Sequence, residues 1–268
     1  MVEVTAMKIS MHTVILTEIR KLRRYSILRA GLIVVVLSDL FAFAPVFAND
    51  GVRKNYTLVM NNILESNCTC FFPALILLTG GFLARREYTD DTLKNILAVP
   101  VPLRKLLSGK MIVLFFLTVF FGILSGLLGI FLCFAAGLPD LTLPLAAEWM
   151  GRIVLGKAFL FIALLPLTIV SAFFVNAVYA CTAAGFVYGF FATMEWAPLN
   201  YYPVKAVLIL FDPQCGAGYD FVRYSKEGAC FSLLAVFLIS VILFLVLRPA
   251  GMADRMKTSK RAARPKGW

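Results

Sequence analysis

Thirty-seven consecutive uncharged residues run from Ala158 to Met194 and read AFLFIALLPLTIVSAFFVNAVYACTAAGFVYGFFATM. A helix that crosses a bilayer needs roughly 20 mostly apolar residues. The run is therefore too long for one untilted span and slightly too short for two spans with a turn. Extended to the range Trp149–Pro198, it predicts two spans that reverse near residues 174–177, where Asn176 supplies a turn residue.

Four further stretches outside this run are long and apolar enough to span a membrane directly. They are Ala30–Ala48, Ser66–Ala84, Met111–Pro139 and Gly228–Leu247. Hydrophobic residues make up 60% of the 268 residues and charged residues only 15%, so the chain cannot cover itself with polar surface in water. We expect an all-α integral membrane protein with six transmembrane helices in one domain, residues 1–268.

The lysines and arginines indicate the orientation of these spans, because cytoplasmic loops carry an excess of positive charge. With six spans, residues 1–29, 85–110 and 248–268 lie on one side and hold 19 of the 26 cations. Five spans would place the seven cations of the tail on the opposite side. The distribution therefore predicts six spans with both termini cytoplasmic. It also predicts that the basic tail 248–268 contacts anionic lipid, and that the net charge of +11 does not indicate a nucleic-acid partner.

Residues 8–25, ahead of the first span, have helical amphipathic periodicity. The apolar face holds Met11, Ile15, Ile19 and Leu22. The opposite face includes Arg20, Lys21 and Arg24, which can reach lipid phosphates while the apolar face lies in the headgroup boundary. We expect an interfacial helix here. A positively charged flank that only sets topology is the alternative.

The polar loop between the second and third spans, residues 87–100, contains the signals of a short helix. Thr89 precedes two aspartates, which suits a helix N-terminus, and Pro100 stops the helix. Its small apolar ridge consists of Leu93, Ile96 and Leu97. An exposed ridge with charged flanks fits a groove on another protein, whereas a loop that touches only lipid is the alternative.

Together, these two segments resemble the permease subunits of ABC-2 type transporters. The similarity is greatest to the bacterial branch associated with lantibiotic immunity and bacitracin-type peptide resistance. It rests on the basic segment Thr17–Arg24 and on Glu87, Thr92, Leu97, Pro100, Arg104 and Lys110, which match the family's loop pattern. Asp91 departs from that pattern, which has glycine there, and residues 101–103 replace a small or hydroxylated residue.

The resemblance implies a function and a set of partners. The loop would be a coupling helix that docks on a separate ABC ATPase subunit, which would carry ATP and magnesium. Two six-span units, either two copies or two paralogues, would form the path for a peptide antibiotic or another amphiphile across the bacterial cytoplasmic membrane. The implied ATPase-coupling residues are Glu87, Thr92, Leu93, Ile96, Leu97, Pro100 and Arg104.

The sequence contains no motif typical of an enzyme. It lacks the G-x-x-x-x-G-K-[ST] phosphate loop, so we expect ATP hydrolysis on another chain. His12 is its only histidine, which argues against a histidine-ligated metal centre, and we expect this chain to bind no cofactor. An ion-coupled secondary carrier, or a scaffold or sensor subunit without transport, is an alternative to the permease.

One acid, Asp39, lies within a clear span, where a carboxylate must be paired or reach water. Its candidate partners are Arg152 and Lys157, near the outer end of the fourth span. Alternatively, these two cations extend to the outer membrane–water interface. Four of the six cysteines fall on or near the outer face, where they could form a disulfide or remain free. These four are Cys68, Cys70, Cys215 and Cys230.

Overall fold

Long apolar helices build the structure, a computed structural model that describes residues 10–22, 26–48, 51, 53–89, 103–173, 178–217 and 222–247. Within these residues the elements are helical and no strand occurs. Five helical segments are long and apolar enough to cross a membrane: Ser26–Phe47, Tyr56–Ala84, Arg104–Ala135, Leu143–Phe173 and Lys226–Val246. The expectation of an all-α multi-pass membrane protein is confirmed.

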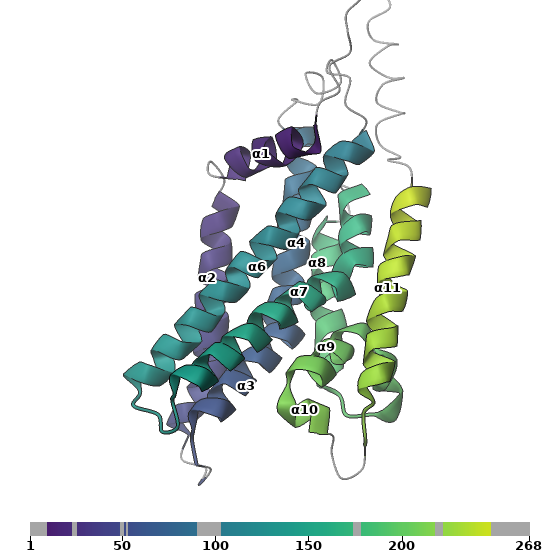
Figure 1. Cartoon of the computed structure of the whole chain (residues 1–268). Coiled ribbons are helices and arrows are strands. Elements are labelled where there is room, and N and C mark those ends of the chain that lie inside the picture. Colours follow the sequence, from purple (N-terminus) through teal and green to yellow (C-terminus); the bar gives the residue numbers. More distant parts are fainter. Residues whose placement is uncertain are drawn as a thin grey trace, which may run out of the picture.

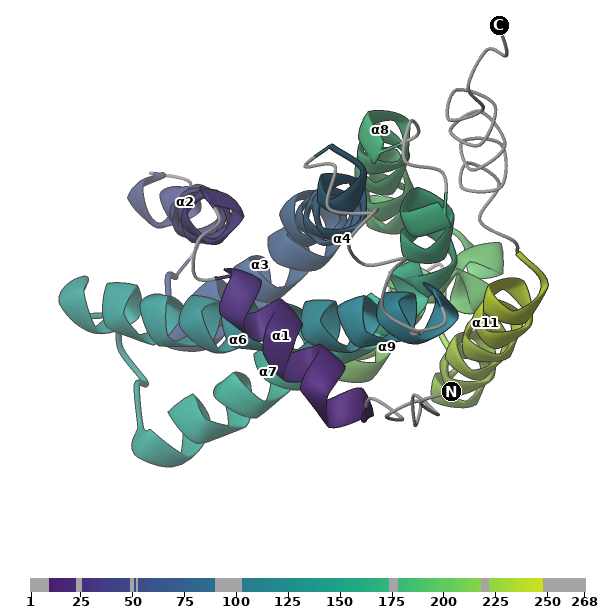
Figure 2. The same ribbon diagram turned by 90° about the horizontal axis from the view of Figure 1, so that it is seen from above.

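The helices of these segments run alongside one another between two distinct ends (Figure 1). At one end α1, Met11–Leu22, lies across the bundle, as the view from above also shows (Figure 2). At the other end lie the short helices α9, Pro203–Phe211, and α10, Pro213–Ala217. We call these the α1 end and the α9 end.

The six-span arrangement is not confirmed, because the last part of the 37-residue run forms a shorter helix. The run is divided between α7, Leu143–Phe173, and α8, Val178–Phe190, and the predicted reversal at residues 174–177 lies outside the described residues. With a following 3₁₀ turn, α8 reaches Thr193 and remains below full span length. It packs along α4, Phe72–Thr89.

The second span begins ten residues earlier than hydropathy predicted. Here α3, Tyr56–Ser66, continues through a π-helical turn, η2, Asn67–Phe71, into α4. The Asn55 side chain caps its start by accepting a hydrogen bond from the amide of Leu58 at 2.9 Å. Polar residues in α3 lowered the apolar score of this segment. Asn61, one of these residues, is tolerated because it faces protein and is only 1% exposed.

Glycines in two helices allow close helix packing. On α6, Leu103–Ala135, a Cβ at Gly122 would lie 2.8 Å from Cγ of Lys157 on α7. On α8, a Cβ at Gly189 would lie 2.3 Å from the carbonyl oxygen of Thr69 in η2. These two glycines belong to the G-x-x-x-G patterns Gly122–Gly126 and Gly185–Gly189, which therefore serve helix packing.

The loop before the last span contains a helix that hydropathy did not predict. Residues 204–209 of α9 are buried, and α9 packs on α7 and on α11, Lys226–Val246. The apolar stretches identified in the sequence do not include this segment. Nine residues are too few for a span, so α9 is packed inside the protein at the end opposite to α1.

Candidate functional site

Of the predicted coupling residues, the structure describes only Glu87 and Arg104, on the two helices that flank the loop. Glu87 is in the last turn of α4, and its side chain is outside the described set. Thr92, Leu93, Ile96, Leu97 and Pro100 lie outside the described residues. Arg104, the next predicted coupling residue along the chain, is described and lies exposed on α6. Its Nη2 donates to the carbonyl oxygen of Leu245 at 2.7 Å. The ATPase-contact assignment therefore stays a prediction.

A buried ion pair joins the segments that flank this loop. Lys110 Nζ on α6 lies 3.0 Å from Oε2 of Glu18 on α1 and donates to the carbonyl oxygen of Leu83 on α4 at 2.8 Å. Lys21 contributes a second cation, 2.6 Å from the other Glu18 oxygen. Glu18 is 3% exposed and Lys110 6%. Lys110 thus contacts both α1 and α4 from its own position on α6.

The charges around Glu18 decide its ionisation state. Burial alone would raise the pKa of this carboxyl, but Lys110 and Lys21 outweigh burial and hold the pKa below its ordinary value of 4.5. Glu18 is therefore ionised at neutral pH, and the pair carries formal charges on both sides.

The contact between α1 and α6 also depends on Gly109, which has no side chain. A Cβ at Gly109 would lie only 2.7 Å from Cγ1 of Val14. The buried residues of α1 are Val14, Glu18 and Leu22, spaced one helical turn apart. The amphipathic prediction included Leu22 in the apolar face but also Ile19, which remains 42% exposed. The face that α1 buries against protein is therefore offset from the apolar face that was expected to lie in the headgroup boundary, and that expectation stays a prediction.

A second polar cluster lies between the spans. Oδ1 of Asp39 on α2, Ser26–Phe43, accepts hydrogen bonds from Asn67 Nδ2 at 3.0 Å and from Ser125 Oγ at 2.8 Å. Asn67 Nδ2 also lies 2.9 Å from Ser125 Oγ. All three side chains are fully buried. Among the described residues, Asp39 Oδ2 and Asn67 Oδ1 have no hydrogen-bond partner.

Lys157 is the cation associated with this cluster. Its side chain is fully buried, and Nζ lies 3.5 Å from Sγ of Cys68 and 4.5 Å from the ring centroid of Phe72. Asp39 and Lys157 are close enough to interact electrostatically. Asn67 and Cys68 both lie in the π-helical turn η2, and such turns are frequent at functional sites.

Arg152, the other candidate partner of Asp39, belongs to the α9 end. Its Nε donates to Glu148 one turn earlier at 3.1 Å, and Nη1 lies 3.5 Å from the carbonyl oxygen of Phe211. The guanidinium also lies 5.3 Å from the Trp149 ring centroid. The structure therefore brings only Lys157 near Asp39.

Near Arg152, a third set of charged residues contacts α9 and α10. Lys205 Nζ lies 2.7 Å from Oε1 of Glu195, and Tyr224 donates to Oε2 of Glu195 at 2.7 Å. Oδ1 of Asp212 caps α10 by accepting from the amides of Gln214 and Cys215. Burial raises the pKa of Asp212 in spite of these bonds.

All six cysteines are free thiols, so the outer disulfide considered from the sequence is not formed in this structure. Cys68 is buried beside Lys157, and Cys215 is buried in α10, where burial raises the pKa of its thiol to about 12. Cys70 is partly buried and Cys230 is exposed on α11. Within the described residues, no group of three or more His, Cys, Asp or Glu side chains could hold a metal ion.

A family model described as ABC-2 family transporter protein matches residues 14–192, about two thirds of the chain. The chain belongs to the ABC-2 transporter family. The match begins in α1 and ends in the 3₁₀ turn after α8, so it includes the ion pair of Glu18 and Lys110 and the buried Asp39. No curated protein and no solved structure matches the chain.

Membership in this family makes the chain the membrane component of an ABC transporter, distinct from the ATPase with which the family works. This weighs against the ion-coupled carrier considered from the sequence. The confirmed part of the prediction is the ABC-2 permease, while the antibiotic-immunity branch remains untested.

Sequence reasoning missed several residues of the Glu18–Lys110 ion pair and of the polar cluster around Asp39. Glu18 was overlooked because it lies among cations, although it is the only acid between residues 8 and 38. Lys110 was noted only as part of the family pattern. Asn67 and Ser125 are uncharged and lie in apolar surroundings, where a buried amide or hydroxyl needs a partner. That rule could have marked Asn67 as a partner for Asp39.

Proposed function

We propose that this chain is the permease subunit of a bacterial ABC exporter that moves a peptide antibiotic or another amphiphile out of the membrane. In this proposal the α1 end is cytoplasmic, α8 serves as a short sixth span, and a second six-span chain completes the path. The resemblance of the loop at residues 87–110 to the immunity branch supports the substrate class. The positive-charge bias supports the orientation.

The observation that carries the coupling mechanism is the contact of Lys110 with both Glu18 and Leu83. An ATPase that pulls on the loop moves the end of α4 and the start of α6. Because Lys110 links both helices to α1, that movement also displaces α1 in the headgroup boundary. The helices α4 and α6 then tilt together with α1 rather than separately.

The ATPase contact is tested by adding charge to the apolar ridge of the loop. In Leu93→Asp or Leu97→Asp, a carboxylate would have to enter an apolar groove, so co-purification of the ATPase from the native host should fall at least about tenfold. The matched control is Asn95→Asp, which adds the same charge between the ridge positions. Normal co-purification of both leucine variants would contradict the coupling assignment.

The substrate class is tested in the same host. Deletion of the gene should increase sensitivity to bacitracin or a lantibiotic, and the wild-type chain supplied with its ATPase should restore resistance. Unchanged sensitivity to both peptide classes, with the ATPase complex intact, would refute the immunity role while leaving the transporter assignment in place.

A further inference from the structure

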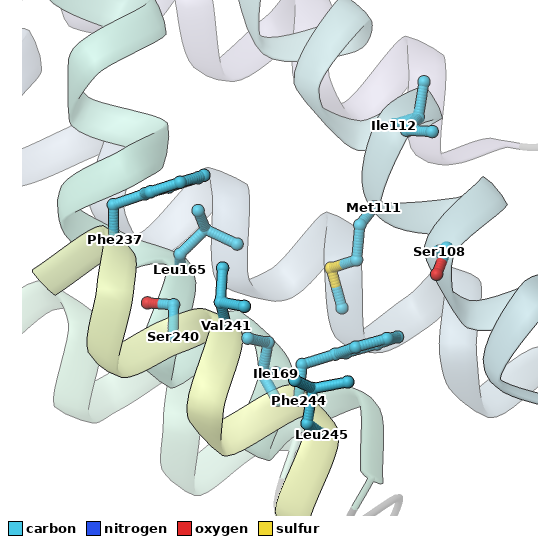
Figure 3. Close-up of a pocket in the computed structure, with 10 residues that line it drawn as sticks. All are labelled: Ser108, Met111, Ile112, Leu165, Ile169, Phe237, Ser240, Val241, Phe244 and Leu245. Carbon is cyan, nitrogen blue, oxygen red and sulfur yellow. The ribbon is translucent and has the colours of Figure 1, made fainter.

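An apolar groove lies near the α1 end between α6 and α11, with α7 as its floor. Its volume is about 260 Å³. Figure 3 shows the side chains of Met111 from α6 and Phe244 from α11 extending into the space between these two helices. The lining residues are Ser108, Met111, Ile112, Leu165, Ile169, Phe237, Ser240, Val241, Phe244 and Leu245.

The groove has almost no polar surface to offer an occupant. Its only two hydroxyl groups already donate within their own helices, Ser108 to the carbonyl oxygen of Arg104 and Ser240 to that of Val236. A polar occupant would therefore lose its hydrogen bonds with water without replacement. The part of the occupant that enters the groove must be hydrocarbon.

A cation, Arg104, lies at the end of the groove where Ser108 and Leu245 line it. Arg104 precedes Ser108 by one turn on α6, is exposed, and reaches across to the carbonyl oxygen of Leu245 on α11. A guanidinium has five N–H donors in a fork that matches phosphate. Hydrocarbon inside the groove and negative charge at its mouth are the two ends of an anionic phospholipid.

The length of the groove agrees with one acyl chain. On α11 it extends from Phe237 to Leu245, about 12 Å at 1.5 Å per residue. One leaflet contributes about half of a hydrocarbon core that is ~30 Å thick. The groove therefore covers most of the depth of a single leaflet.

We propose that this groove binds an acyl chain of an anionic phospholipid whose phosphate contacts Arg104. The bound lipid fills the gap between α6 and α11, two helices that both pack on α7. It lies against the turn of α6 that also carries Lys110, so occupancy stiffens the part of α6 that connects to α1.

The test uses the full-length chain, purified in mild detergent without its ATPase and stripped of lipid. Dioleoyl phosphatidylglycerol and dioleoyl phosphatidylcholine, which share acyl chains, are titrated separately, and bound lipid is counted by native mass spectrometry. We expect phosphatidylglycerol to bind about fivefold more tightly, the factor typical of one surface cation. Arg104→Gln should remove this preference and leave the weaker binding of phosphatidylcholine.

A bulky substitution distinguishes lipid binding in the groove from lipid binding elsewhere on the surface. Val241→Phe adds a ring inside the groove and should weaken binding of both lipids about tenfold, because acyl contacts are displaced. The matched control, Ile242→Phe, adds a ring at the next position of α11, where Ile242 is 60% exposed and outside the groove. The control should bind as the wild type does.

Three results would overturn the proposal. One is equal binding of the two phospholipids by the wild-type chain. Another is equal binding by the Val241→Phe and Ile242→Phe variants. The third is a wild-type dimer that Val241→Phe converts to a monomer without loss of lipid, which would assign the groove to a second copy of the chain. Because no ATPase is present, failure here does not bear on the coupling mechanism.

Discussion

Lys110 Nζ lies 3.0 Å from Glu18 Oε2, although the two residues are 92 positions apart and both side chains are almost fully buried. A buried ion pair is a poor stabiliser compared with apolar packing, but removal of one partner leaves an uncompensated charge. The pair therefore acts as a constraint: α1 can leave α6 only if both charges are hydrated again.

The first prediction concerns this pair. Glu18→Gln should destabilise the chain by about 3 kcal/mol or more, since it removes the buried carboxylate that Lys110 contacts. Lys110→Met should cost less, because Glu18 keeps its contact with Lys21 at 2.6 Å. The double variant should cost less than the sum of the two. Thermal unfolding of the purified variants in detergent measures the coupling. Additive single effects would show that the two charges do not interact.

The pH dependence of the same contact follows from the pKa of Glu18. Because its folded pKa lies below the ordinary value of 4.5, the ionised carboxylate stabilises the fold. This contribution is fully present above the ordinary pKa and is lost as the pH falls through the lower folded pKa. Wild-type unfolding temperature should therefore drop below about pH 4.5 more steeply than that of Glu18→Gln. Parallel curves would contradict this assignment.

A third prediction tests the close approach of α1 to α6. Gly109→Ala would bring a methyl group within 2.7 Å of Val14 Cγ1, so α1 must shift. Proteolysis at the cations of α1 should become faster. Val14→Ala in the same chain should reverse the effect. The matched control is Gly151→Ala, where a Cβ meets nothing within 4 Å and the added helix propensity should stabilise by roughly 0.5–1 kcal/mol.

The fourth prediction concerns the polar cluster between the spans. Asp39→Asn and Lys157→Met should each reduce the yield of folded protein, because each leaves the opposite charge alone in a low-dielectric interior. The double variant is neutral and should recover yield. Its transport activity then separates two roles for the cluster: full activity means a structural pair, and lost activity means a direct role in transport. Equal loss of yield in all three variants would rule out electrostatic pairing.

What could be predicted from the sequence depended on local composition. The apolar runs indicated the spans, because the free energy of membrane burial depends on the length and composition of each segment. Hydropathy failed at α3 and α9. Asn61 faces protein rather than lipid, which a hydropathy average cannot register, and α9 is too short to stand out as a span.

The sequence by itself determined the class of this protein: an all-helical membrane component, with its cations concentrated at the termini and one loop, and the family pattern that begins at Glu87. Only the tertiary structure decided which charges meet. It pairs Glu18 with Lys110, brings Lys157 rather than Arg152 toward Asp39, and leaves Arg104 at the mouth of an apolar groove. Partner choice depends on the packing of helices distant in the chain, since a charge in a low-dielectric interior is stabilised only by the groups that packing places beside it.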